Sequence, residues 1–97
     1  MKVMVTGVNG ILGKEIVNLL SKNKSYQLVL LSNSKINYKN KKNIKLIKQD
    51  LTKSLIFKLN IDSIIHCAAK NPLSKSGSDM KTIYNDNLKI TKNLIKF

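Results

Sequence analysis

Residues 3–13 read Val3-Met4-Val5-Thr6-Gly7-Val8-Asn9-Gly10-Ile11-Leu12-Gly13. The first four residues are typical of a short buried strand, and a helix is expected to begin at Ile11. The stretch holds three of the chain's four glycines. Gly7 would turn the chain out of the strand, Gly10 would let backbone N–H groups approach a phosphate, and Gly13 would let the helix pack closely on the sheet. The stretch therefore predicts a strand, a glycine turn and a helix whose N-terminus attracts an anion. A tight turn without a ligand is the alternative.

Outward from this turn, strand and helix signals alternate along the chain. We expect strands at 27–31, 44–48 and 61–68, helices at 11–22 and 79–96, and a short helix within 52–59. Leu12, Ile16, Leu19 and Leu20 would form the apolar face of the first helix. Short apolar strands separated by helices are typical of a parallel sheet covered on both faces. With right-handed crossovers, the predicted fold class is α/β, a doubly wound sheet of strand order 3-2-1-4.

Length and charge set the broad class. The chain has 97 residues, which is one small domain at most, and a net charge of +13 from 18 lysines, no arginine and five acidic residues. The lysines are scattered, and Lys, Asn and Ile, which are all abundant here, have A/T-rich codons. Arginine is the preferred residue for reading bases. A solvated lysine surface is therefore favoured over a nucleic-acid partner.

The same sequence indicates a cytoplasmic protein. A single cysteine, Cys67, excludes an internal disulfide and fits a reducing compartment. No apolar run approaches the roughly 18 residues that span a bilayer. The N-terminus lacks the apolar core of a secretory signal. No metal site is predicted.

The Gly-x-x-Gly-x-x-Gly spacing after Thr6 resembles the opening of the extended short-chain dehydrogenase/reductases, the NAD-dependent epimerase/dehydratase family. Three later segments match that family in order: Gln49-Asp50-Leu51, residues 62–69, and Asp79 followed by residues 84–95. The resemblance covers nearly the whole chain and implies a Rossmann-type sheet. It also implies an oxidoreductase that uses NAD(P) on a nucleotide-sugar, as an epimerase, dehydratase or reductase.

The resemblance and the glycine turn together predict the residues that bind the cofactor. They are Gly7, Asn9, Gly10, Ile11, Leu12, Gly13, Ser32, Asn33, Lys35, Asp50, Leu51, Ala68 and Ala69. By resemblance, Asp50 contacts the adenine ring; the alternative is that it caps a helix near Thr52. No acid follows the second strand to bind a ribose 2′-hydroxyl, so the sequence favours NADP over NAD.

Asn87 is the predicted catalytic residue. Ile83, Asn87, Ile90 and Leu94 share one helical face, which aims an amide at the sheet. By resemblance, Asn87 is the asparagine that holds a water in the family's proton relay; the alternative is a core asparagine bonded to nearby backbone. His66 is expected to be a satisfied core residue without an acid–base role. Cys67 is expected to be a small core hydrophobe.

The family's Tyr-x-x-x-Lys pair, which transfers the proton, has no counterpart in the expected region. Tyr38 and Lys42 have this spacing but lie in the loop after the second strand, so we interpret them as coincidence. Residues 1–97 are therefore expected to be the dinucleotide-binding part of a truncated enzyme, without its substrate domain and inactive alone. A non-catalytic NAD(P)-binding sensor or scaffold is the alternative. The sequence is compatible with a homodimer.

Overall fold

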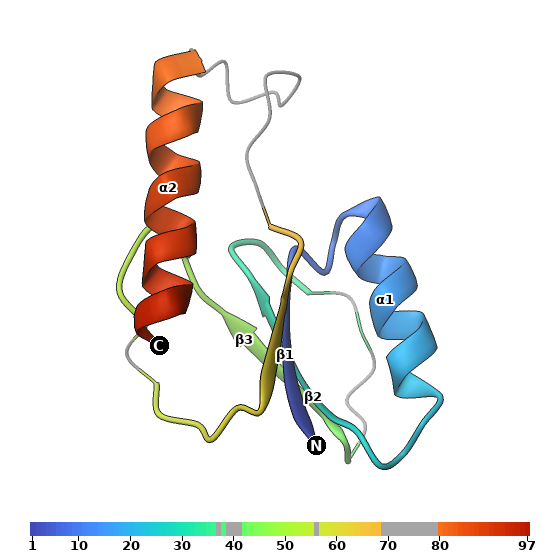
Figure 1. Ribbon diagram of the computed structural model, residues 1–97. Helices are drawn as coiled ribbons and strands as arrows, with labels where there is room; N and C mark the ends of the chain where they lie inside the picture. Colours follow the sequence, from blue (N-terminus) through green and yellow to red (C-terminus); the bar gives the residue numbers. More distant parts are fainter. Residues whose placement is uncertain (37, 39–41, 56, 69–79) are drawn as a thin grey trace.

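The computed structural model describes residues 1–36, 38, 42–55, 57–68 and 80–97 (Figure 1). The described elements, in chain order, are β1 (Lys2–Thr6), α1 (Ile11–Ser21), β2 (Gln27–Ser32), β3 (Ile44–Lys48), β4 (Ser63–His66) and α2 (Met80–Lys96). The strands form one parallel sheet in the order β3-β2-β1-β4. The predicted α/β class and strand order are confirmed.

The parallel pairing brings the carboxyl ends of the strands to one edge of the sheet. Thr6, at the end of β1, lies opposite Leu31 of β2 and His66 of β4. Ser32 of β2 in turn lies opposite Lys48 of β3. The glycine turn and the loops after β2, β3 and β4 therefore start side by side, which is where open α/β sheets bind ligands.

Alternation along the central strands divides the core between the two faces. Val3 and Val5 pack with Leu28, Leu30 and Val17 of α1 on one face. The other face holds a second cluster, composed of Met4, Val29, Leu31, Leu51, Ile90 and Leu94. Figure 1 shows α1 and α2 on opposite sides of the sheet. The expected covering of both faces is confirmed.

The expected apolar face of α1 is partly wrong. Leu12 and Leu19 are 65% and 66% exposed, whereas Gly13 and Val17 are the buried residues of the helix. Ile16 and Leu20 pack against the core as expected. The reason is Gly13, which brings its own side of the helix against the β1–α1 turn and rotates Leu12 and Leu19 outward.

Two expected boundaries also differ. Instead of a helix within 52–59, the described residues there form a turn at 51–53, in which the Lys53 N–H donates to the Asp50 carbonyl oxygen at 3.1 Å. β4 covers Ser63–His66 rather than 61–68. In the described part of the chain, β4 pairs only with β1 and is the edge of the sheet.

Candidate functional site

A cavity of about 260 Å³ opens at the carboxyl edge of the sheet. It is lined by Gly7, Gly10, Ser32, Asn33, Asp50, Leu51, Thr52, Cys67, Ala68 and Ile90. These residues come from the glycine turn, the loops after β2, β3 and β4, and α2. The cavity thus brings together many of the residues predicted to bind a cofactor, from four separate segments of the chain.

The three glycines of the turn meet different surroundings. Gly7 has a φ of +69°, and a Cβ there would lie 2.5 Å from the Cys67 carbonyl carbon. A Cβ at Gly13 would overlap the carbonyl oxygen of Gly7. Gly10 is exposed, has extended backbone angles of −79° and 168°, and would bring a Cβ only to within 3.4 Å of the Gly7 oxygen. The fold therefore requires glycine at positions 7 and 13 but not at position 10.

The N-terminus of α1 lies beside Gly10. Gly10 is the N-cap of this helix and supplies no side chain to bond the first-turn N–H groups. Such N–H groups have no partner within the helix and carry the positive end of its dipole. Ile11 and Leu12, which the sequence predicts to bind the cofactor, are 90% and 65% exposed, and neither residue lines the cavity. An anion at this helix N-terminus would meet their backbone N–H groups and not their side chains.

Asn9 ties the glycine turn to the loop after β2. Its Nδ2 donates to the Ser32 and Ser34 hydroxyls at 3.2 and 2.9 Å and to the Lys35 carbonyl oxygen at 3.0 Å. Asn9 and Lys35 do not line the cavity. They line a neighbouring hollow of about 530 Å³ together with Lys14 and Tyr38.

Asp50 and its neighbours form the wall after β3. The Asp50 Oδ1 accepts hydrogen bonds from the Thr52 N–H at 2.9 Å and the Thr52 hydroxyl at 2.7 Å. The carboxylate thus closes a turn and does not cap a helix, contrary to the alternative considered above. Leu51 is buried. Thr52, which sequence reasoning missed, enters the wall because this turn follows Asp50.

Thr6 connects β1 to the loop after β4. Its Oγ1 accepts hydrogen bonds from the N–H groups of Cys67 and Ala68, at 3.0 and 3.1 Å. A hydroxyl has two acceptor lone pairs and one hydrogen. The hydrogen is therefore left to donate to His66 Nδ1, 2.7 Å away. His66 accordingly carries its proton on Nε2.

Two expectations for this segment are wrong. His66 is exposed, because β4 is the edge strand, although it is hydrogen-bonded as expected. Partial burial of its ring still lowers the pKa of His66. Cys67 is half-buried and lines the cavity instead of the core, since it lies beyond the end of β4.

Asn87 lies on the predicted face of α2. Ile83, Ile90 and Leu94 are buried and Asn87 is half-buried. Asn87 does not line the cavity, but Ile90, one helical turn further, does. Ile90 could have been found from the same apolar pattern. Ala69, the remaining predicted residue, lies outside the described residues.

The Tyr38 side chain has a structural contact in the fold. Its hydroxyl donates to the Val8 carbonyl oxygen at 3.2 Å, and burial raises the pKa of Tyr38. Both effects keep the phenol protonated. This favours the interpretation of Tyr38 and Lys42 as a chance spacing.

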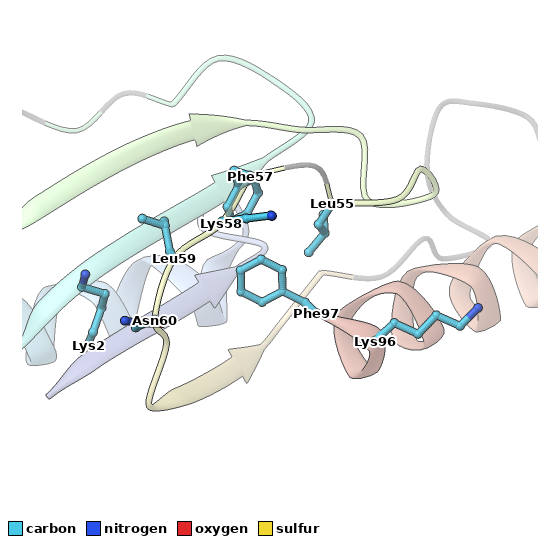
Figure 2. Close-up of a pocket in the computed structure, with 8 residues that line it drawn as sticks. All are labelled: Lys2, Leu55, Phe57, Lys58, Leu59, Asn60, Lys96 and Phe97. Atoms are coloured by element: carbon cyan, nitrogen blue, oxygen red, sulfur yellow. The ribbon is translucent and has the colours of Figure 1, made fainter.

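A larger hollow, of about 560 Å³, lies at the opposite edge of the sheet and contains none of the predicted site residues (Figure 2). Its lining includes Lys2, Phe57 and Phe97, and the two phenylalanine ring centroids are 5.0 Å apart. In the described ranges, no three His, Cys, Asp or Glu side chains are grouped to hold a metal ion. Within those ranges no helix has the length and apolarity needed to cross a membrane.

Solved structures with the same fold include sugar-nucleotide epimerases and a uronate dehydrogenase. UDP-galactose 4-epimerase is 24% identical with a TM-score of 0.76, over 99% of this chain and 33% of that one. UDP-glucuronic acid 4-epimerase from Bacillus cereus in complex with NAD is 24% identical with a TM-score of 0.77, over 99% and 35% of the two chains. Uronate dehydrogenase from Agrobacterium tumefaciens is 19% identical with a TM-score of 0.72, over 98% and 35%. At these identities the likeness establishes the fold, and the chain spans about a third of the length of these structures.

Sequence comparison identifies the family. No match is found among curated proteins. The profile of the NAD dependent epimerase/dehydratase family, however, matches residues 3–97, which is nearly the whole chain and includes the glycine turn and α2. The chain therefore belongs to the NAD dependent epimerase/dehydratase family.

Proposed function

We propose that the cavity at the carboxyl edge binds a nicotinamide dinucleotide. The observation that carries this proposal is Gly10. The fold has room for a side chain there, yet the position lies between the cavity and the N-terminus of α1. A pyrophosphate on the helix N-terminus needs close backbone approach, which a side chain at this position would block.

The remaining lining residues suit the adenosine part of such a ligand and its path across the end of β4. Asp50 and Leu51 offer a carboxylate and an apolar surface for the adenine, and Ser32 and Asn33 offer polar groups for its ribose. Ala68 is small where the dinucleotide would cross the end of β4. When bound, the nicotinamide would accept or return a hydride. The residues of this chain would bind and orient the cofactor through these contacts.

The charges beside the cavity favour NADP over NAD. Lys14, Lys35 and one carboxylate, Glu15, line the hollow next to Asn9, so positive charge is in excess there, and no carboxylate follows β2 to bind the ribose 2′-hydroxyl. The negative charge of a 2′-phosphate would be attracted by the ammonium groups of both lysines. Replacing Lys35 by alanine is expected to weaken NADP⁺ binding more than NAD⁺ binding. Equal weakening of both would contradict this preference.

In a complete enzyme, the hydride would pass to or from a carbon of a nucleotide-sugar. The Bacillus cereus UDP-glucuronic acid 4-epimerase has been solved with UDP-glucuronic acid and NAD. Residues 1–97 would supply the cofactor-binding part, and Asn87 would hold a water of the proton relay. Because the chain lacks a suitably placed Tyr-x-x-x-Lys pair, the 97 residues alone are expected to show no turnover. A non-catalytic dinucleotide-binding sensor or scaffold, which would use the same cavity, is the second candidate.

The test is titration of the chain with NAD⁺ and NADP⁺ by calorimetry. Gly10→Val is expected to abolish binding while the circular dichroism spectrum stays that of the parent. Asn60→Val is the control, because Asn60 is exposed at the opposite edge of the sheet. Unchanged affinity in a folded Gly10→Val variant would refute the site. An in-frame Tyr-x-x-x-Lys downstream in the gene would favour the enzyme over the sensor.

A further inference from the structure

Asn93 makes a polar contact between α2 and the wall of the cavity. Its Nδ2 donates to the Leu51 carbonyl oxygen at 2.8 Å and to the Lys53 carbonyl oxygen at 3.0 Å. An amide NH₂ has two hydrogens, so both are used on this one turn. Because both partners are carbonyl acceptors, the amide must present its nitrogen and not its oxygen.

The turn that Asn93 holds is the segment that carries Asp50. Residues 50–53 belong to neither a helix nor a strand, and Asp50, Leu51 and Thr52 all line the cavity. Within the turn, Asp50 bonds Thr52 and Lys53. These local bonds shape the turn, but they do not attach it to the rest of the molecule.

Helix α2 contacts the turn in two ways, beside the packing of Leu51 on Met4, Val29 and Leu31 of the sheet. Leu51 packs with Ile90 and Leu94 in one apolar cluster, and Asn93 lies between these two residues in the sequence. Apolar packing resists separation but permits sliding, whereas two hydrogen bonds from one planar amide fix both position and orientation.

We propose that Asn93 is a positioning residue that fixes the Asp50–Thr52 wall and thereby sets the affinity of the cavity for the adenosine half of a dinucleotide. The inference rests on the proposed function of the cavity. It assigns to α2 a role in cofactor affinity that is separate from the role proposed for Asn87.

The test replaces Asn93 by aspartate, which keeps the shape of the side chain but points oxygens at two carbonyl oxygens. Asn85→Asp is the matched control, because Asn85 is exposed on the same helix and the charge change is identical. Three ligands are titrated: NAD⁺, AMP and inorganic pyrophosphate. We expect the Kd of AMP and of NAD⁺ to rise roughly tenfold in Asn93→Asp, since losing two hydrogen bonds and placing a carboxylate against two carbonyl oxygens has an effect of this order. Pyrophosphate, which would lie at the N-terminus of α1, is expected to bind unchanged.

The outcomes separate the two proposals. If the parent chain binds neither AMP nor NAD⁺, the proposed function fails and this inference falls with it. If the parent binds and Asn93→Asp binds AMP equally well, only the role of Asn93 is overturned. If the affinity for all three ligands falls equally and the melting temperature also falls, Asn93 has only a structural role. That result would likewise overturn the proposed positioning role. Should Asn93→Asp fail to fold, Asn93→Ala takes its place, because water can reach the two carbonyls beside a small side chain; the same expected and contradicting results apply.

Discussion

At the scale of the residue, the glycine turn contains glycines that the fold requires and one that the proposed ligand requires. Gly7 and Gly13 are fixed by contacts with backbone atoms, which have no freedom to move aside. Gly10 meets no such contact. One motif therefore contains two glycines that the protein needs in order to fold and one that it can replace.

Alanine substitutions should reveal this division. Gly13→Ala is expected to lose at least about 1–3 kcal/mol of unfolding free energy, because its Cβ would overlap the Gly7 carbonyl oxygen. Gly10→Ala is expected to lose less than about 1 kcal/mol, the difference between glycine and alanine as N-caps. Denaturant unfolding measures both. Equal losses would show that Gly10 is also a folding requirement.

His66 should make stability depend on pH. The Nδ1 atom of His66 accepts from Thr6, and both lone pairs of the Thr6 hydroxyl are already used, so a proton on Nδ1 breaks the network. The folded state therefore lowers the pKa of His66, in line with its partial burial. A base whose pKa is lower when folded binds fewer protons than in the unfolded state. Stability is then complete above the unfolded pKa of about 6.5 and is lost as the pH falls below it.

Unfolding midpoints measured between about pH 7.5 and pH 5 would show this loss. His66→Asn, which offers an amide oxygen to Thr6 but does not titrate, is expected to lose less stability over the same range. A parallel decline in both proteins would assign the effect to other groups.

At the scale of the element, the glycine turn and the strands could be predicted because their signals are local. Apolar runs of four to six residues and glycines at fixed spacing are visible without knowledge of tertiary contacts. The face of α1 could not be predicted as well, since Leu12 and Leu19 fit a helical period but Gly13 decides which side meets the sheet. The turn at 51–53 was missed for a related reason: the hydrogen bonds of Asp50 and Asn93 shape it, and Asn93 is distant in the sequence.

Helix α2 depends on a narrow apolar stripe. Leu94 is 6% exposed in the second core cluster, whereas its neighbour Ile95 is 78% exposed. Leu94→Ala is expected to cost about 2–5 kcal/mol, the usual cost of emptying a core position. Ile95→Ala is the control and should change stability by less than about 0.5 kcal/mol. Since the whole domain has only about 5–15 kcal/mol available, Leu94→Ala could unfold it, and thermal melts of both variants would tell.

At the scale of the whole molecule, the sheet ends at β4, which has no second neighbouring strand among the described residues. β4 contacts β1 on one side only, and Ile64 is 36% exposed on it. The same chain spans about a third of the length of the solved structures that share its fold. An uncovered parallel edge with apolar side chains is a template for pairing with another chain.

The 97-residue chain alone is therefore expected to be marginally stable and to self-associate through β4. Its charge of +13 opposes association, so added salt should promote it by screening the repulsion. Sedimentation velocity at low and high salt, together with thermal melts, measures both properties. Ile64→Lys places a charge on the edge and should restore the monomer, whereas Leu19→Lys, the same change at an exposed position on α1, should leave association unaltered. A sharp two-state melt above about 60 °C from a strict monomer would contradict the prediction, because such stability is high for a mesophilic domain and would show that the exposed edge of β4 does not weaken the fold.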